Sequence, residues 1–330
     1  MWSLNVRWRS CVVRLMALLP VFALLQVAQA QWHAVAGSQS VDQARQALAF
    51  LPNELWIHAG DSITWSFNAG EIHTVTFLST DPIAQIRPPF DVGCPGFSSD
   101  PATFDGSTCV TTPPLVKGAN FTVFFPAAGN FKLVCLVHPD MTAAIHVLDV
   151  SQPLPYTQGF YDREAQEQTR DLLSAHEGNV EHGDHHHLGH PVIAGSGEIV
   201  STPGGTESLS VMRFTGDKMI IRAGQTVEWE NNDPEDPHTI TFGTEPEDLM
   251  DPSPNVTVDA DGARHATINS TSDNVHSGFI MAAPQDRIGL AQSPLFVTRF
   301  RITFAHAGIY PYICALHDEL GMTGKIIVVP

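Results

Sequence analysis

The sequence predicts an all-β protein of two antiparallel β-sandwiches, and three observations support this prediction. The chain has 330 residues, of which 43% are hydrophobic, and this is enough for two ordinary domains with a core each. Its 25 glycines and 24 prolines indicate many turns, which favours a β-rich architecture over helical bundles. The third observation is an internal repeat whose two copies alternate hydrophobic and polar residues with the period of a strand.

Residues 1–30 precede the predicted fold and have the features of a secretory signal peptide. A basic segment with three arginines is followed by the hydrophobic run 15–27 and by Ala28-Gln29-Ala30, which is typical of a cleavage site. A membrane anchor is the alternative, but the hydrophobic run is short for a membrane span, and no later run is long enough to cross a bilayer. We therefore expect a secreted or periplasmic protein with no membrane span after signal cleavage.

The rest of the chain is strongly acidic. Without the arginines of residues 1–30 it contains 14 basic and 35 acidic residues, which gives a net charge of −21. This charge argues against binding to nucleic acid, which requires a basic surface. It is compatible with redox partner proteins that present a cationic surface.

The internal repeat defines the two predicted domains. The segment "LWIHAGDSITWSFNAGEIHTVTF" at 55–77 matches "MIIRAGQTVEWENNDPEDPHTITF" at 219–242, and both predict strand, turn and strand. Near the end of each copy, "FPAAGNFKLVCLVH" matches "FAHAGIYPYICALH". We expect one domain per copy, at 31–150 and 195–330, with longer loops at about 81–103 and 244–274.

Residues 151–194 form the predicted linker between the domains. Within it, "YDREAQEQTRDLL" at 161–173 predicts a short helix, and "HEGNVEHGDHHHLGHP" at 176–191 predicts an exposed loop because of its Gly, Asp and Pro residues. Five histidines of this loop are candidate accessory metal ligands, with a solvated, pH-sensitive linker as the alternative: His182, His185, His186, His187 and His190.

The five cysteines fall into three groups. Cys11 lies in the predicted signal peptide. Cys94 and Cys109 enclose a segment rich in Pro, Gly, Ser and Asp. In an exported protein we expect a disulfide bond between them, with free thiols or additional metal ligands as the alternative. Cys135 and Cys314 remain, and they occupy equivalent places in the two copies of the repeat.

Each copy of the repeat contains a histidine, a cysteine, a second histidine and a methionine in the same order. A Cys thiolate and two His nitrogens in a plane, with a weak axial Met sulfur, form a type 1, or blue, copper site for electron transfer. Each residue alone has an ordinary structural explanation, but two matched sets favour copper. The sequence therefore predicts two mononuclear copper sites, with the ligands His73, Cys135, His138 and Met141, and His238, Cys314, His317 and Met322.

In these residues the chain resembles the cupredoxin, or blue copper, family. Cys-Leu-Val-His-Pro-Asp-Met has the Cys-x2-His-x2-Met spacing of amicyanin, and Cys-Ala-Leu-His-Asp-Glu-Leu-Gly-Met has the Cys-x2-His-x4-Met spacing of plastocyanin and pseudoazurin. The resemblance implies two Greek-key β-sandwiches with copper near one end and electron transfer between Cu(I) and Cu(II). Many members have Asn after the strand histidine, and its side chain holds the ligand loop. This chain has Thr74 and Thr239 there, whose hydroxyls are candidates for that bond.

Two other functions use similar domains. Copper enzymes such as nitrite reductases and multicopper oxidases also hold a catalytic copper with histidines at a domain interface, and the oxidases mark it with His-Cys-His. Here the residues beside the two cysteines are Val134, Leu136, Ile313 and Ala315, so that marker is absent. A copper sequestration or delivery protein would have the same ligands as an electron carrier. We predict an electron carrier and not an enzyme.

Overall fold

The structure is a computed structural model, and it describes residues 29–79, 94, 96–175, 191–282 and 297–330. The predicted signal peptide, apart from its last two residues, and the five candidate histidines of the linker lie outside the described residues. Strands dominate the described part of the chain, so the prediction of an all-β protein is confirmed. Among the described residues, no helix is both long and hydrophobic enough to cross a membrane.

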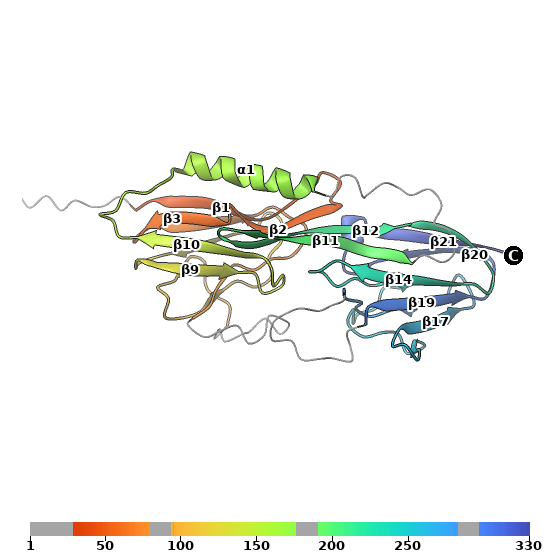
Figure 1. Cartoon of the computed structure of the whole chain (residues 1–330). Helices are drawn as coiled ribbons and strands as arrows, with labels where there is room; N and C mark the ends of the chain where they lie inside the picture. Colours follow the sequence, from red (N-terminus) through yellow and green to blue (C-terminus); the bar gives the residue numbers. More distant parts are fainter. Residues whose placement is uncertain (1–28, 80–93, 95, 176–190, 283–296) are drawn as a thin grey trace, which may run out of the picture.

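The first half of the chain forms two sheets that pack face to face (Figure 1). One sheet contains β1 (Gln31–Gln39), β2 (Arg45–Leu51), β4 (Ser62–Phe67), β6 (Ala102–Thr103) and β8 (Asn120–Phe124). The other contains β3 (Glu54–His58), β5 (Thr76–Phe77), β7 (Val110–Thr111), β9 (Gly129–Val134) and β10 (Thr142–Leu148). Alternate side chains point into the core, as the period of a strand requires: in β4 these are Ile63, Trp65 and Phe67.

The second half repeats this arrangement. One sheet contains β11 (Val192–Thr202), β12 (Gly205–Thr215), β14 (Thr226–Asn232), β16 (Thr257–Val258), β17 (Arg264–Ile268) and β19 (Arg299–Phe304). The other has the strand order β13 (Lys218–Arg222), β21 (Thr323–Val329), β20 (Gly308–Ile313), β15 (Thr241–Phe242) and β18 (Val275–His276). This order matches β3, β10, β9, β5 and β7 of the first half position by position. The segment 244–274, expected as a loop, contains β16 and β17.

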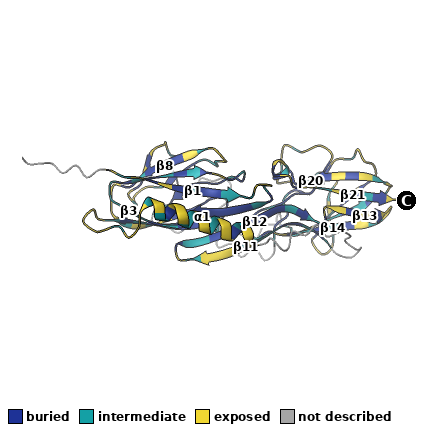
Figure 2. Cartoon of the chain, turned by 90° about the horizontal axis from the view of Figure 1, so that it is seen from above, coloured by how far each residue is buried: buried dark blue, intermediate teal, exposed yellow. Residues whose placement is uncertain are grey.

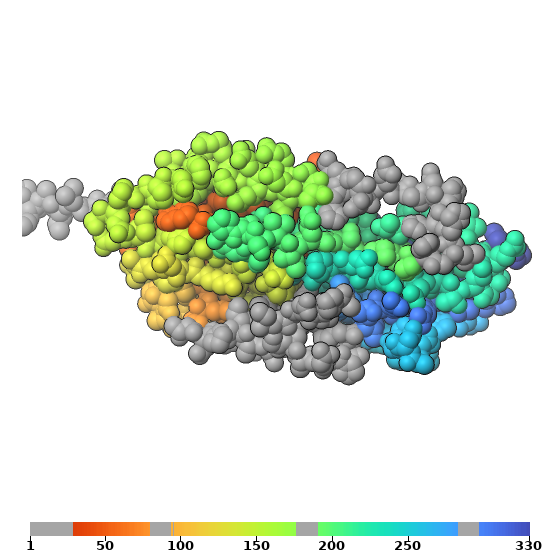
Figure 3. All heavy atoms as spheres, in the orientation of Figure 1, coloured from red at the N-terminus to blue at the C-terminus, as the bar shows by residue number. Residues whose placement is uncertain are grey.

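The two halves share one sheet. β2 and β12 pair antiparallel, with Ala47 opposite Leu209, and join the two larger sheets into one of eleven strands. The backbone N–H of Met212 continues this ladder by donating to the carbonyl of Ala44 over 2.7 Å. In Figure 3 the atoms of β11 and β12, in green, lie directly against those of the first half. The linker is therefore not the only connection between the two halves.

The predicted linker helix is longer than expected and belongs to the first half. α1 (Gln158–Ser174) covers the outer face of β1 and β2, and its exposed residues form the outside of the molecule (Figure 2). Leu172 packs against Ala47, Ala49 and Leu51 of β2. Tyr161 reaches the first core, where its hydroxyl accepts the N–H of Trp56 over 2.8 Å and donates to the carbonyl of Trp56 over 3.0 Å. Elsewhere in this half, Cys94 and Cys109 are joined in a disulfide bond.

Candidate metal centres

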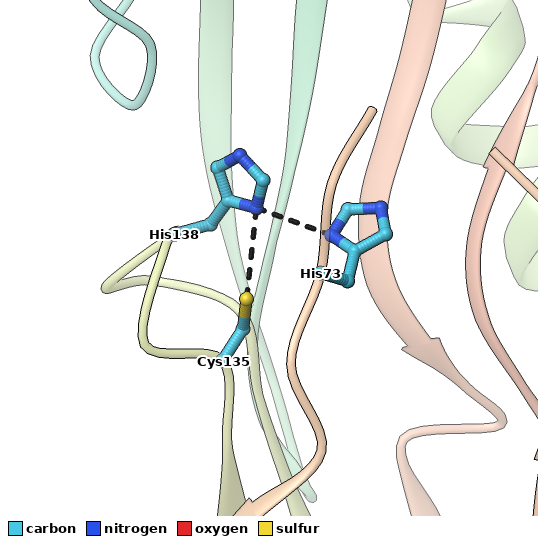
Figure 4. Close-up of side chains that lie close together, drawn as sticks. All are labelled: His73, Cys135 and His138. Atoms are coloured by element: carbon cyan, nitrogen blue, oxygen red, sulfur yellow. Dashed lines mark hydrogen bonds between the residues drawn. The ribbon is translucent and has the colours of Figure 1, made fainter. Parts of the chain in front are cut away.

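Three of the predicted ligands of the first half meet at one buried point (Figure 4). The Nδ1 atoms of His73 and His138 are 3.1 Å apart, and the sulfur of Cys135 is 3.7 Å from Nδ1 of His138. His73 reaches this point because its backbone N–H and carbonyl pair with Leu115, over 2.9 and 2.8 Å. Cys135 follows β9 directly, and His138 lies in the turn that leads to β10.

The second half brings its equivalent residues together in the same way. The Nδ1 atoms of His238 and His317 are 3.1 Å apart, and the sulfur of Cys314 lies 3.7 Å from the first and 3.4 Å from the second. His238 is held by paired backbone hydrogen bonds to Ile280, of 3.0 and 2.9 Å. One sulfur and two imidazole nitrogens thus converge twice in the chain.

The predicted axial methionines close the two ligand turns. Cys135 N–H donates to the carbonyl of Met141, and Cys314 N–H donates to that of Met322, each over 3.0 Å. Both methionines are fully buried. The second turn is two residues longer, and three of its residues form the short helix η1 (Asp318–Leu320), which ends at Gly321 with a φ of 87°. The longer His-to-Met spacing of the second turn therefore leaves the backbone hydrogen bond between the cysteine and the methionine unchanged.

Thr74 and Thr239 hold the ligand turns, as their positions suggested. The hydroxyl of Thr74 accepts the N–H of Leu136 over 2.8 Å, and that of Thr239 accepts the N–H of Ala315 over 2.7 Å. The backbone N–H groups of the same threonines donate to the cysteine sulfurs, over 3.4 Å in the first half and 3.3 Å in the second. Each threonine therefore connects the histidine strand to the loop that carries the other ligands.

The surroundings favour the thiolate form of both cysteines. Burial raises the pKa of the Cys135 thiol, but hydrogen bonds to His138 and His73 outweigh burial and hold this pKa well below its ordinary value. Burial also opposes ionisation of Cys314, and the charges and hydrogen bonds of His317 and His238 lower its pKa well below the ordinary value. A thiolate beside two imidazoles and a buried thioether is a donor set that fits copper.

Two glycines that were not singled out in the sequence leave the space that the imidazoles of the strand histidines occupy. Gly37 in β1 and Gly195 in β11 have φ values of 71° and 72°, and each lies at an irregularity of its strand ladder. A Cβ atom on Gly37 would overlap the imidazole of His73, and one on Gly195 would overlap that of His238. The signal was present in the sequence as Ala-Gly-Ser, which occurs at 36–38 and again at 194–196.

Buried carboxylates surround the outer nitrogens of the ligand histidines. Asp236 Oδ1 lies 3.1 Å from Nε2 of His138, and Glu71 Oε2 lies 3.5 Å from Nε2 of His317. In the second half, Asp233 Oδ2 lies 3.5 Å from Nε2 of His238. In the sequence these acids lie in the turn predicted within each copy of the repeat. The signal that could have identified two of them is an acidic residue two positions before each strand histidine, Glu71 and Asp236.

These carboxylates raise the pKa values of two of the ligand histidines. Burial lowers the pKa of His138, but the charge and hydrogen bond of Asp236 raise it well above its ordinary value. Burial likewise opposes the charged form of His238, while the contacts with Asp233 and Cys314 raise its pKa to about 10. A carboxylate on the outer nitrogen of a metal-ligating histidine fixes the orientation of the ring and makes the inner nitrogen a stronger donor.

Comparison with known proteins finds a family match in the second half of the chain. Residues 201–329 match the family of copper binding proteins of the plastocyanin/azurin type. A variant of amicyanin in the Cu(I) state is 17% identical over 36% of this chain and 74% of that chain, with a TM-score of 0.22. Oxidised plastocyanin from Dryopteris crassirhizoma is 16% identical over 42% of this chain and 100% of that chain, with a TM-score of 0.23. No curated protein matches the sequence.

Proposed function

We propose that the chain is an exported blue copper protein that transfers single electrons, because residues 201–329 match the plastocyanin/azurin family of copper-binding proteins. In this proposal the chain is a tandem of two copper-binding domains, and each domain holds one mononuclear type 1 copper. The observation that carries the proposal is the convergence of one cysteine sulfur and two histidine nitrogens in each half of the chain. The two ligand sets are those predicted above: His73, Cys135, His138 and Met141, and His238, Cys314, His317 and Met322.

Copper in such a donor set supplies a one-electron couple between Cu(I) and Cu(II). The chain's own contribution is to hold the donors nearly fixed while the charge changes. The hydroxyls of Thr74 and Thr239 anchor the two ligand turns, and their backbone N–H groups donate to the cysteine sulfurs. Hydrogen bonds to a ligating sulfur tune the reduction potential. The partners would be redox proteins, for which the excess of acidic residues favours a cationic surface.

A two-domain copper enzyme is supported less well. Such an enzyme requires a further copper with ligands of its own. Apart from the two predicted sites, the described residues place one more group of potential metal ligands together, Glu71, His138 and Asp236. This group shares His138 with the first predicted copper site, so it does not offer an independent set of ligands.

The test is a quantified EPR spectrum, together with visible absorption, of the copper-loaded protein. We expect two copper ions per chain, both with the narrow hyperfine splitting of type 1 centres. Cys135→Ser and Cys314→Ser should each remove one blue centre and leave the other, so each variant is the control for its counterpart. Copper with only ordinary type 2 splitting would contradict the proposal. Blue copper that chelators remove readily and that does not cycle reversibly would indicate copper delivery instead.

A further inference from the structure

The ligand histidines of the two turns, His138 and His317, face the opposite half of the molecule and not solvent. Their exposures are 0% and 3%. The equivalent strands β2 and β12 pair antiparallel with each other, so the two halves are related by an approximate two-fold axis. An arrangement of this kind brings equivalent ends together, and here it brings together the ends that carry the candidate copper ligands.

The carboxylates at this interface are exchanged between the halves. Glu71 belongs to the first half and lies two residues before His73, yet its Oε2 is 3.5 Å from Nε2 of His317 in the second half. Asp236 belongs to the second half and lies two residues before His238, yet its Oδ1 is 3.1 Å from Nε2 of His138 in the first half. Each half therefore supplies, from the same position of the repeat, a carboxylate to a ligand histidine of the other half.

Glu71 also connects the two candidate centres directly. Its second oxygen, Oε1, is 3.9 Å from Nε2 of His138, so a single carboxylate lies between a ligand histidine of each half. Glu71 and Asp236 are both buried. In such surroundings charges interact more strongly than in water, so these carboxylates affect the electrostatic energy of a charge at either centre. A neighbouring contact fixes the arrangement, because the backbone N–H of Asp140 donates to Oε1 of Glu235 over 3.0 Å.

From this geometry, and resting on the proposed function, we propose that Glu71 and Asp236 are positioning residues that make the two copper centres one coupled unit. Asp236 orients His138, and Glu71 orients His317 while also facing His138. The negative charge of each carboxylate stabilises the more positive, oxidised state of the centre in the other half. The reduction potential of each centre then depends on residues that the other half of the chain provides.

The experiment uses the full-length, copper-loaded protein with one blue centre removed at a time. In the Cys314→Ser background only the first centre contributes colour, and Asp236→Asn in this background should raise its reduction potential. In the Cys135→Ser background only the second centre remains, and Glu71→Gln should raise its potential. The direction follows because removing a negative charge disfavours the oxidised metal. Each potential is read from a spectroelectrochemical titration of the blue absorption, with EPR hyperfine splitting as the second signature.

The matched control is Glu54→Gln in both backgrounds. Glu54 also pairs with a histidine, with Oε1 3.0 Å from Nε2 of His146, but neither residue belongs to the candidate centres. This variant should leave both potentials unchanged. If Asp236→Asn prevents folding, Asp236→Glu keeps the charge and should retain a potential closer to that of its parent than a neutral residue would.

Potentials and EPR spectra that stay constant in Asp236→Asn and Glu71→Gln would overturn the inference. A lower unfolding midpoint with unchanged potentials would show that the carboxylates only hold the two halves together, and this too would overturn it. These outcomes leave the proposed function intact, because they require a blue centre in each parent. A Cys135→Ser or Cys314→Ser parent without any blue centre would instead reject the proposed function, and this inference with it.

Discussion

At the scale of single residues, the candidate ligands and the two threonines beside them could be proposed from the sequence, whereas the glycines and carboxylates around them could not. His73, Cys135 and His138 are identified by residue type and spacing alone, because few arrangements other than a metal site place these groups in this order twice. Gly37 and Asp236 act only after distant strands have met: the glycine leaves room for an imidazole of another segment, and the carboxylate reaches the other half of the chain. Both lie in patterns that occur in each copy of the repeat, Ala-Gly-Ser and an acidic residue two positions before the strand histidine, but neither pattern indicates a contact with a distant segment.

Gly37→Ala should eliminate the first blue centre, and Gly195→Ala should eliminate the second. A Cβ atom at either position overlaps the imidazole of the strand histidine, so that ligand must move away from its partners. The positive φ adds a strain of about 1–2 kcal/mol for a residue that is not glycine. The measurement is copper content per chain together with blue absorption.

The controls for this prediction are Gly60→Ala and Gly224→Ala. These glycines have φ values of 96° and 83°, but a Cβ atom on either would have no neighbour within 4 Å. The two variants carry the backbone strain without the overlap, and both blue centres should survive in them. Equal loss of copper in the controls would show that backbone conformation, and not the space for histidine, explains the effect.

At the scale of elements, the order of strands was predictable and the contents of the longest loops were not. Period-2 alternation identified the strands on both sides of each ligand, including β4 and β14. β17 was missed because the segment 244–274 is rich in turn residues, although Ala266 and Ile268 alternate inward within it. The hydroxyl contacts of Thr74 were only candidates at that stage, because they depend on how the histidine strand meets the ligand turn.

Thr74→Val should destabilise the first ligand turn without changing its shape. The substitution leaves the buried N–H of Leu136 without its acceptor, and such a loss lowers the free energy of unfolding by about 1–3 kcal/mol. The first blue centre should also shift in its absorption maximum, while the second stays as it was. Urea unfolding and visible spectra give the two readouts. Thr74→Ser keeps the hydroxyl and should restore both the stability and the absorption maximum of the first centre. A serine variant as unstable as the valine variant would contradict this explanation.

At the scale of the whole molecule, two sandwiches were predictable and their joint sheet was not. The pairing of β2 with β12 depends on the meeting of two strands from different halves, for which neither strand has a separate signal. The sequence of β2 indicates something else: "RQALAFL" lacks the alternation of a half-exposed strand, and six of its seven residues are buried. A strand of this kind is covered on both faces, here by the first core and by α1.

Glu207 makes the stability of the whole molecule depend on pH. This side chain lies in β12, and burial, with a smaller effect from the charge of Asp171 in α1, raises its pKa to about 7. The folded state therefore holds this proton more tightly than the unfolded state, whose carboxyl has an ordinary pKa. The free energy of unfolding is unaffected below the unfolded pKa, falls as the pH rises toward 7, and stays lowered above it.

Glu207→Gln should remove this fall in the free energy of unfolding at higher pH. Near pH 4.5 the variant and the wild type should unfold at similar urea concentrations, and above pH 8 the variant should be more stable by about 2–3 kcal/mol. The comparison of the two proteins at low pH is the internal control. Stability curves that run parallel over the whole range would show that Glu207 does not titrate differently in the folded and unfolded states.

The burial of His138 and His317 between the halves affects how the protein acquires its metal. While the interface is closed, both imidazoles are buried, and a carboxylate of the opposite half lies against each of them, so we expect a copper ion in solution to reach them slowly. We therefore expect uptake to be fastest before the two halves dock during folding, or during a transient opening of the interface. The same barrier slows release, so an ion bound before closure is retained for as long as the interface holds. The timing of metal uptake is in this way set by the assembly of the fold.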